Sequence, residues 1–335
     1  MTDRIAIIGA GLSGLILARS LSHHADVTVF EKARGVGGRM STRYADPFYF
    51  DHGTDKFTAR TPAFQNFIKP YLDAGIIQAW QGKVVSFHAD GQISKRQWFE
   101  PHYVACPRMN SFCHALAEGI DVKTQIEIAP LSGRSSQGWH LQDKDGQDLG
   151  VFNWVISTAP PAQTHRLFQG VSTGSFTFQD VRMEGCYSLM IGFQKPWDKT
   201  WIAAKVHEGL IDWISVNSSK PGRDDRVTSI VAYSTHDWAE KYMDADMGWA
   251  QKELIASFEQ VTDISCEMAD HVTTHRWKYA IAQKSEDQKE HISTPFLDTD
   301  LRIAAVSDWA SASRIENVWE SAMSFVDVYR RAVFK

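Results

Sequence analysis

Three glycines near the start of the sequence, Gly9, Gly11 and Gly14, follow the spacing Gly-x-Gly-x-x-Gly. They come directly after a short apolar run and open a segment of helical character, which is the context in which this spacing holds a dinucleotide. The first glycine permits a tight turn, the second lets the backbone approach a pyrophosphate, and the third lets helix and strand pack closely. The start of the helix also offers free N–H groups to an anion. We therefore expect this turn, including Leu12 and Ser13, to contact a dinucleotide.

Two charged residues would complete such a site. Glu31 ends the next predicted strand, where a carboxylate can accept hydrogen bonds from both hydroxyls of a ribose. Arg39 follows two further glycines, and its guanidinium can pair with phosphate oxygens through two bonds and offset their charge. A solvated basic loop is the alternative for this segment. NAD and FAD share the glycine fingerprint, so it does not choose between these two cofactors.

A βαβ unit must position these residues. Residues 5–8 form a short apolar run bounded by glycine, which is typical of a buried parallel strand. Residues 12–21 indicate a helix, and the β-branched run at 27–31 indicates a second strand. The first thirty residues therefore predict one compact βαβ unit.

The later elements predict that the chain leaves this domain and returns to it. Asp145-Gly146 has turn chemistry and separates two predicted strands. After a mixed middle region, a buried strand and a helix with apolar positions at helical spacing close the sequence. The predicted strands are 122–128, 139–142, 151–158, 227–233 and 303–306, and the predicted helices are 249–258 and the segment with Val318, Ala322, Phe325 and Tyr329.

Length and composition predict a globular protein with two lobes. The chain has 335 residues, more than a comfortable single core, with 43% hydrophobic and 22% charged residues. The formal net charge of −5, without a basic run, argues against nucleic acid as a partner. The longest uncharged stretch, residues 5–18, is too short to span a bilayer and lacks the basic leader of a signal peptide. We expect no association with a membrane.

The cysteines predict a reducing compartment. Cys106, Cys113, Cys186 and Cys266 are widely spaced and form no CxxC pair, which argues against a zinc site and against a disulfide framework. We therefore expect a cytoplasmic protein without a bound metal.

The stretch from Glu31 to Thr42 resembles the ExxxxxGGRxxT extension of the glutathione reductase 2 group of FAD enzymes, which includes amine oxidases, phytoene desaturases and renalases. Within this group the sequence looks most like renalase and its bacterial relatives. The blocks that carry the resemblance follow in family order and at about family spacing, and they are residues 34–43, 51–53, 57–60, 219–223, 275–280 and 307–309.

The resemblance implies an α/β fold of the p-hydroxybenzoate hydroxylase and amine oxidase type. In this architecture a discontinuous Rossmann-type FAD-binding domain is joined to a second, α+β substrate domain. We expect the FAD-binding domain at residues 1–80, 104–164 and 285–335, and the substrate domain at 81–103 and 165–284. None of the four cysteines lies in a flavinylation context, so we expect FAD to be bound noncovalently.

The resemblance also implies where the flavin is held. In such proteins the arginine of GGR, here Arg39, lies near the pyrophosphate and the flavin. The aspartate that matches Asp308 hydrogen-bonds the ribityl chain, and a helix that starts near Ile315 would favour anionic reduced flavin through its positive end. The further cofactor contacts that we expect are Lys32, Gly38, Met40, Gly53, Thr54 and Ile126.

The implied activity is the oxidation of 2- or 6-dihydro isomers of NAD(P)H to NAD(P)+, with molecular oxygen as acceptor and hydrogen peroxide as product. Hydride transfer to a flavin needs a donor carbon held close to N5 rather than a strong general base, so we expect no catalytic triad. His52 and His275 are candidates for the substrate cleft. For either residue, a structural histidine held by hydrogen bonds is the more frequent case.

The sequence departs from the family pattern at the flavin end. Relatives carry glycines where this chain has Ser307, Asn317 and Ala322, and these side chains could crowd the flavin ring. A Gly-Ala-Gln-Tyr block of relatives is Gly-Thr-Asp-Lys at residues 53–56, which predicts a changed substrate. Two alternatives therefore stay open, a flavin-containing amine oxidase and a non-catalytic FAD-binding or nucleotide-sensing protein. The sequence does not define the oligomeric state.

Overall fold

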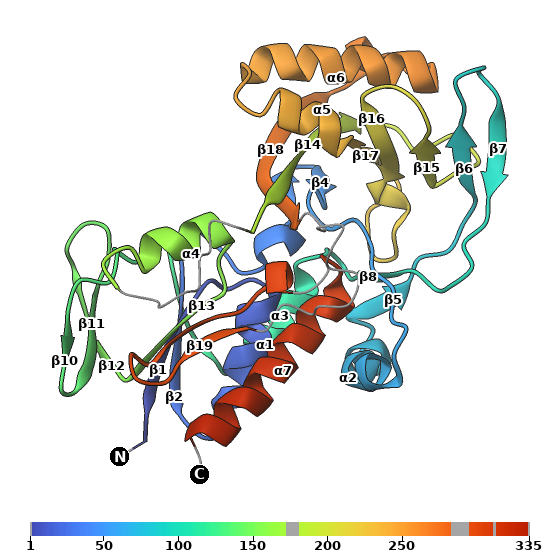
Figure 1. The fold of residues 1–335 in the computed structure, drawn as a ribbon. Coiled ribbons are helices and arrows are strands. Elements are labelled where there is room, and N and C mark those ends of the chain that lie inside the picture. The colour runs from blue at the N-terminus through green and yellow to red at the C-terminus, as the bar shows by residue number, and fades with distance from the viewer. Residues whose placement is uncertain (1, 172–180, 283–294, 311–312, 334–335) are drawn as a thin grey trace. The chain divides into compact units, whose positions relative to one another are not determined.

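The computed structural model describes residues 2–171, 181–282, 295–310 and 313–333 (Figure 1). The chain divides by its internal contacts into two units. Unit 1 comprises Met1–Gly38, Cys113–Met183 and Ile281–Lys335, and unit 2 comprises Arg39–Phe112 and Glu184–Ala280. Residues 39–80 and 104–112, which we expected in the cofactor domain, fall in unit 2, and residues 165–183, which we expected in the substrate domain, fall in unit 1. Which residues serve the cofactor and which the substrate stays a prediction. The predicted boundary between residues 284 and 285 lies outside the described residues.

A mostly parallel sheet forms the centre of unit 1. Ile5, Ala6 and Ile7 of its strand β1 are fully buried, because a parallel sheet is covered on both faces, and the strand therefore reads as a continuous apolar run. The strand order is β19-β20-β13-β1-β2-β9, and only the β19–β20 pair is antiparallel. The strands are β1 (Arg4–Ile8), β2 (Asp26–Glu31), β9 (Asp121–Thr124), β13 (Trp154–Ser157), β19 (Phe296–Asp298) and β20 (Ile303–Ala305).

The helices α1 (Leu12–Leu21) and α7 (Ile315–Val333) are far apart in the sequence but lie side by side in unit 1 (Figure 1). Ala322, Phe325 and Tyr329 lie at helical spacing along α7 and are fully buried, as the apolar pattern predicts. The remaining elements of unit 1 are α3 (Ser111–Ala117), whose first turn belongs to unit 2, α4 (Pro161–Leu167), and an antiparallel sheet of β10 (Arg134–Ser135), β11 (Gly138–Gln142) and β12 (Asp148–Phe152).

A seven-stranded sheet in the order β18-β14-β17-β16-β15-β6-β7 forms the centre of unit 2. Buried residues of this sheet, such as Leu189 and Ile214, share a hydrophobic core with Leu254 and Phe258 of helix α6. The strands are β18 (His271–Ala282), β14 (Met183–Phe193), β17 (Thr228–Ser234), β16 (Ile211–Val216), β15 (Ala203–Val206), β6 (Val84–Phe87) and β7 (Ile93–Arg96). The helices are α2 (Pro62–Asp73), α5 (His236–Lys241) and α6 (Met247–Thr262). Two small antiparallel sheets are formed by β3 (Arg43–Ala45) with β4 (Phe48–Phe50) and by β5 (Ile77–Ala79) with β8 (Tyr103–Ala105).

The predicted α/β fold with a Rossmann-type domain is confirmed, and so are the first strand, the first helix and the second strand. The prediction of one strand over residues 151–158 is wrong. Asn153 separates β12 from β13 because its backbone N–H and side-chain oxygen both bond to Arg4, at 2.8 and 2.7 Å, where the chain changes from the small sheet to the parallel one. The strand predicted at 122–128 ends at Thr124, because Gln125 adopts a φ of 61°.

Three further expectations concerned disulfides, membrane-spanning helices and metal sites. All four cysteines are free and buried. Within the described ranges, no helix combines the length and the apolar character that crossing a membrane requires. In the same part of the chain, no three His, Cys, Asp or Glu side chains gather as they would around a metal ion.

Candidate functional site

The turn between β1 and α1 has the backbone shape that its glycines predict. Gly9 has a φ of +113°, a conformation that residues with a Cβ rarely adopt. The Thr158 hydroxyl donates to the carbonyl oxygens of Ile8 and Gly9, both at 3.1 Å, and so stabilises the turn. A Cβ on Gly14 would lie 2.0 Å from the Gly9 carbonyl oxygen, so only glycine allows the helix to pack this closely.

Gly11 differs from its two partners because nothing in unit 1 fills the space beside it. A Cβ at this position would have no heavy atom within 4 Å. Gly11 is also the N-cap of α1, with no side-chain cap on the helix and no acidic residue in the first turn. The first N–H groups of α1 and the positive end of its dipole are therefore free to receive an anion beside Gly11. This open space and the uncapped helix start fit a pyrophosphate.

Glu31 closes the other side of the same turn. One carboxylate oxygen accepts a hydrogen bond from the backbone N–H of Ala10 and the other from that of Ala33, both at 2.8 Å. The side chain is buried, with 8% of the residue exposed, so its position at the end of β2 is fixed. Each oxygen keeps a further lone pair. The carboxylate can therefore still accept hydrogen bonds from a ribose, the role predicted for it.

The second glycine-rich loop lies against the first one. Gly37 donates its N–H to the Ala10 carbonyl at 2.9 Å, and a Cβ on Gly38 would lie 3.3 Å from the Gly11 Cα. Gly38 therefore lies against the first glycine turn, and its predicted contact with a cofactor stays a prediction.

Three further predicted contacts of unit 1 lie around β2 and α1. The Ile126 N–H donates to the Glu31 carbonyl at 2.9 Å, and Lys32 donates to the Gln163 side chain at 3.0 Å. The Ser13 hydroxyl donates to the Val306 carbonyl at 3.3 Å and so ties the start of α1 to the end of the closing strand. These bonds place the residues around the turn, and their contacts with a cofactor stay predictions.

Asp308 is a buried acid just after β20. It is 1% exposed and accepts hydrogen bonds from the hydroxyls of Ser307 at 3.1 Å and Ser313 at 2.8 Å. Ile315, two residues beyond Ser313, begins α7. Ser307, one of the residues that replace a family glycine, thus helps to hold the aspartate in place.

The remaining predicted cofactor residues lie in unit 2. Arg39 donates to the Ala280 carbonyl at 3.0 Å, and the Thr54 N–H donates to the Arg39 carbonyl at 2.7 Å, which brings Gly53 and Thr54 against Arg39. Met40 is buried, with 2% exposed. The structure gathers these residues of unit 2 around Arg39, and whether they touch a cofactor stays a prediction.

The two predicted histidines lie together in unit 2. The ring centroids of His52 and His275 are 4.9 Å apart, and both rings pack on Trp277, at 5.0 and 4.5 Å. Burial lowers the pKa of His52 to about 3 and that of His275 to about 4, with a further contribution from the positive charge of Arg43. Both imidazoles are therefore neutral at neutral pH. Their roles in a substrate cleft stay predictions.

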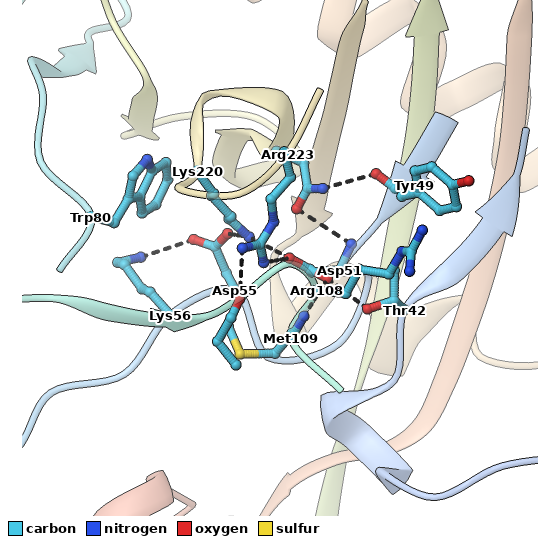
Figure 2. Close-up of polar contacts among 12 residues, drawn as sticks. Thr42, Tyr49, Asp51, Asp55, Lys56, Trp80, Arg108, Met109, Lys220 and Arg223 are labelled. Carbon is cyan, nitrogen blue, oxygen red and sulfur yellow. Dashed lines mark hydrogen bonds and ion pairs between the residues drawn. The ribbon is translucent and has the colours of Figure 1, made fainter. Parts of the chain in front are cut away.

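The sequence analysis missed a buried charge cluster in unit 2, formed by Asp51, Asp55, Lys56, Lys220 and Arg223 (Figure 2). Arg223 and Lys220 lie 2.6 and 3.4 Å from one carboxylate oxygen of Asp51, and Lys220 and Lys56 lie 2.9 and 3.2 Å from Asp55. The Lys220 and Asp51 side chains are completely buried. Burial alone would raise the pKa of Asp51, but Lys220 and Arg223 lower it to about 2. The local sequence carries no signal for the cluster, because Asp51, Asp55 and Lys56 lie in a polar stretch that is typical of a solvated loop.

Neutral groups add hydrogen bonds to the cluster, although the buried Arg223 Nε has no hydrogen-bond partner among the described residues. Thr42 and the Met109 N–H donate to Asp51 at 2.7 and 3.0 Å, and Arg223 donates to the carbonyl oxygens of Ala105 and Pro221 at 2.6 and 2.7 Å. Such partners are needed because a buried ion pair offsets the loss of hydration only when its other polar atoms are also bonded. The cluster therefore joins Asp51 to the loop that carries Arg223 within unit 2.

Comparisons with known proteins agree with the glycine turn. Residues 7–71 match the model of the NAD(P)-binding Rossmann-like domain. The 4,4'-diapophytoene desaturase (4,4'-diaponeurosporene-forming) of Staphylococcus aureus strain Newman is 40% identical over 77 residues, which are 20% of this chain and 15% of that protein. The enzyme of the same name from strain MRSA252 is 51% identical over 51 residues, or 15% of this chain and 10% of that protein. The chain thus aligns with only a small part of these relatives.

Solved structures resemble the chain over almost its whole length. A proposed protoporphyrinogen oxidase from Exiguobacterium sp. 255-15 has a TM-score of 0.79 at 10% identity, covering 99% of both chains. Reduced UDP-galactopyranose mutase has a TM-score of 0.78 at 11% identity, covering 100% of this chain and 95% of the other. Putrescine oxidase bound to putrescine has a TM-score of 0.69 at 12% identity, covering 99% of both.

The matched domain and the geometry of the turn define the class of protein. The chain carries a Rossmann-type NAD(P)-binding domain within a mixed α/β fold. Its whole-chain fold is the one seen in putrescine oxidase and in the proposed protoporphyrinogen oxidase.

Proposed function

We propose that this protein is an FAD-dependent oxidoreductase that binds FAD noncovalently in unit 1. The observation that carries the proposal is the open space beside Gly11 at the uncapped start of α1, with the Glu31 carboxylate fixed on the other side of the turn. Bound FAD would supply a two-electron centre that accepts a hydride. The fold shared with oxidases supports redox chemistry, and the similarity of 77 residues to a desaturase supports it further.

Different residues of unit 1 would recognise different parts of FAD. The N–H groups at the start of α1 would face the pyrophosphate, and Glu31 would accept hydrogen bonds from the ribose of the AMP half. Asp308, held by two serine hydroxyls, would accept a hydrogen bond from the ribityl chain. None of the buried free cysteines is needed for attachment.

For the substrate we propose a dihydronicotinamide nucleotide, in keeping with the resemblance to renalases. The 2- or 6-dihydro form would lose a hydride and become NAD(P)+, and oxygen would gain the two electrons with two protons in total and leave as hydrogen peroxide. The protein has to position the donor carbon, because this chemistry needs no strong base. The neutral His52 and His275 fit that role, since neither carries a charge at neutral pH that would repel the product cation.

The visible spectrum of the purified protein tests the proposal. We expect a yellow protein whose colour passes into the supernatant on denaturation, and whose absorbance near the flavin maximum disappears when 2- and 6-dihydronicotinamide nucleotides are added without air. Admission of air should restore the absorbance with formation of hydrogen peroxide. Bleaching by putrescine or another amine alone would replace the proposal by an amine oxidase. A yellow protein that nothing reduces would indicate a sensor, and colourless protein that refuses FAD would refute the proposal.

A further inference from the structure

Unit 2 contains a pocket of about 560 Å³, separate from the residues proposed to hold FAD. This volume lies in the range of small-molecule sites. The pocket is formed by two segments, residues 79–84 and 95–102, and its lining includes Trp80, Arg96, Trp98, Phe99 and His102. We propose that this pocket binds a small planar aromatic carboxylate.

The aromatic walls of the pocket are the first argument. The rings of Trp98 and His102 stack with centroids 4.0 Å apart, and Trp80 meets Trp98 edge to face at 5.4 Å. Trp80 is buried and donates to the Ser219 hydroxyl at 3.2 Å, so it holds the half-buried Trp98 in place from inside the fold. Phe99 has 92% of its surface exposed and offers a further apolar face. A flat ring would gain stacking contacts and cover apolar surface that water now wets.

The charge behind these walls is the second argument. By formal charge the buried cluster holds three cations, Lys56, Lys220 and Arg223, against two carboxylates, an excess of one positive charge, and burial lowers the pKa of Lys56. Trp80 and Trp98 separate the cluster from the pocket, with the Lys220 and Lys56 nitrogens 5.4 and 6.0 Å from their ring centroids (Figure 2 shows Trp80 beside Lys220 and Lys56). An anion in the pocket would offset this excess through a medium of low dielectric constant.

The lining itself adds positive charge. Lys95 and Arg96 line the pocket, and the acid among the lining residues, Glu100, pairs with Arg60 through both of its carboxylate oxygens. Burial and the nearby Lys56 lower the pKa of His102, so its ring stacks in the neutral form and leaves the anion to the lysine and arginine side chains. The pocket thus combines a planar apolar wall with positive charge from Lys95 and Arg96. A neutral ring would use only the wall, and a compact anion would use only the charge.

Saturation-transfer NMR and calorimetry with benzoate as the probe test the inference on the full-length protein. We expect saturable binding of one benzoate, with benzamide and acetate binding at least about tenfold more weakly, because one lacks the charge and the other the ring. Trp98→Ala and Arg96→Gln should each weaken benzoate binding by at least about tenfold. Trp249→Ala and Arg226→Gln are the matched controls, since both residues are exposed elsewhere in unit 2, and they should leave binding unchanged.

The outcomes separate this site from the proposed flavin site. Melting temperatures of the variants, compared with that of the wild type, show that they are folded, and bound FAD is measured from the spectrum of each variant. Equal binding of benzamide or acetate, no saturable binding, or benzoate binding that survives both Trp98→Ala and Arg96→Gln would overturn the inference. Because FAD content is read independently, loss of benzoate binding by a variant with normal FAD content supports the pocket, and wild-type protein that binds benzoate but takes up no FAD counts only against the proposed function.

Discussion

Replacement of Gly11 by alanine should separate cofactor binding from folding. The added methyl group meets no heavy atom within 4 Å, and the backbone at φ −75° and ψ 179° suits any residue. Alanine is a poorer N-cap than glycine, which lowers the stability. It also reduces the conformational entropy of the unfolded chain, which raises the free energy of unfolding by about 0.4–1 kcal/mol. We therefore expect the free energy of unfolding to change by less than about 1 kcal/mol.

The same methyl group would occupy the space proposed for the pyrophosphate. Overpacking a tight contact costs about 1–3 kcal/mol, which weakens FAD binding roughly 5- to 150-fold. Calorimetric titration of FAD-depleted protein with FAD measures the Kd, and urea denaturation measures the stability of the same samples. Gly133→Ala is the matched control, because Gly133 is an exposed glycine of unit 1 that also has no heavy atom within 4 Å of an added Cβ.

Gly14→Ala, unlike Gly11→Ala, should reduce the stability of the protein as well as FAD binding. Its Cβ would lie 2.0 Å from the Gly9 carbonyl oxygen, so helix or turn has to move, and we expect a loss of at least about 2 kcal/mol in stability as well as a loss of FAD. A wild-type Kd for Gly11→Ala would show that the phosphates do not approach this residue. A stability loss for Gly11→Ala as large as that for Gly14→Ala would refute the reasoning from open space.

Three further predictions concern charge. Glu31→Gln should weaken FAD binding in the same titration, because the amide replaces one acceptor oxygen with a donor group; unchanged affinity would argue against ribose recognition. Lys220→Met should lower the free energy of unfolding in urea by about 1–3 kcal/mol, because Asp51 and Asp55 each lose one buried cationic partner and keep only Arg223 and Lys56, whereas the exposed Lys144→Met should stay within about 0.5 kcal/mol. Because His52 and His275 have pKa values of about 3 and 4 in the folded protein against an ordinary 6.5, the unfolded chain takes up protons first as the pH falls. Stability should therefore decrease from about pH 6.5 toward pH 4, and a flat urea midpoint over that range would contradict the burial of these rings.

Local sequence signals were sufficient for the dinucleotide turn. Gly9, Gly11, Gly14 and Glu31 belong to one βαβ unit of consecutive elements, so their spacing already defines the geometry that the structure shows. The break at Asn153 was not predictable in the same way, because it depends on bonds to Arg4, which is far away in the sequence.

The buried charge cluster shows why the rest could not be predicted. Asp51 and Lys220 are 169 positions apart, and neither residue has a partner nearby in the sequence that would indicate a buried pair. An Asp-Lys dipeptide such as Asp55-Lys56 has the composition of a solvated loop. Only the tertiary fold of unit 2 removes these groups from water and gives them their partners.

The course of the chain between the two units affects how the protein is made. The backbone passes from one unit to the other after residues 38, 112, 183 and 280, and the parallel sheet of unit 1 combines β1 and β2 with β20, which is supplied by residues 303–305. During synthesis on a ribosome, the first strands must therefore wait for nearly three hundred further residues to emerge before their sheet is complete. Unit 2 can close while this happens, since its last strand ends by residue 282. The nascent glycine turn thus stays without its finished sheet until residues 303–305 have emerged, and a premature stop before β20 would leave the parallel sheet of unit 1 unfinished.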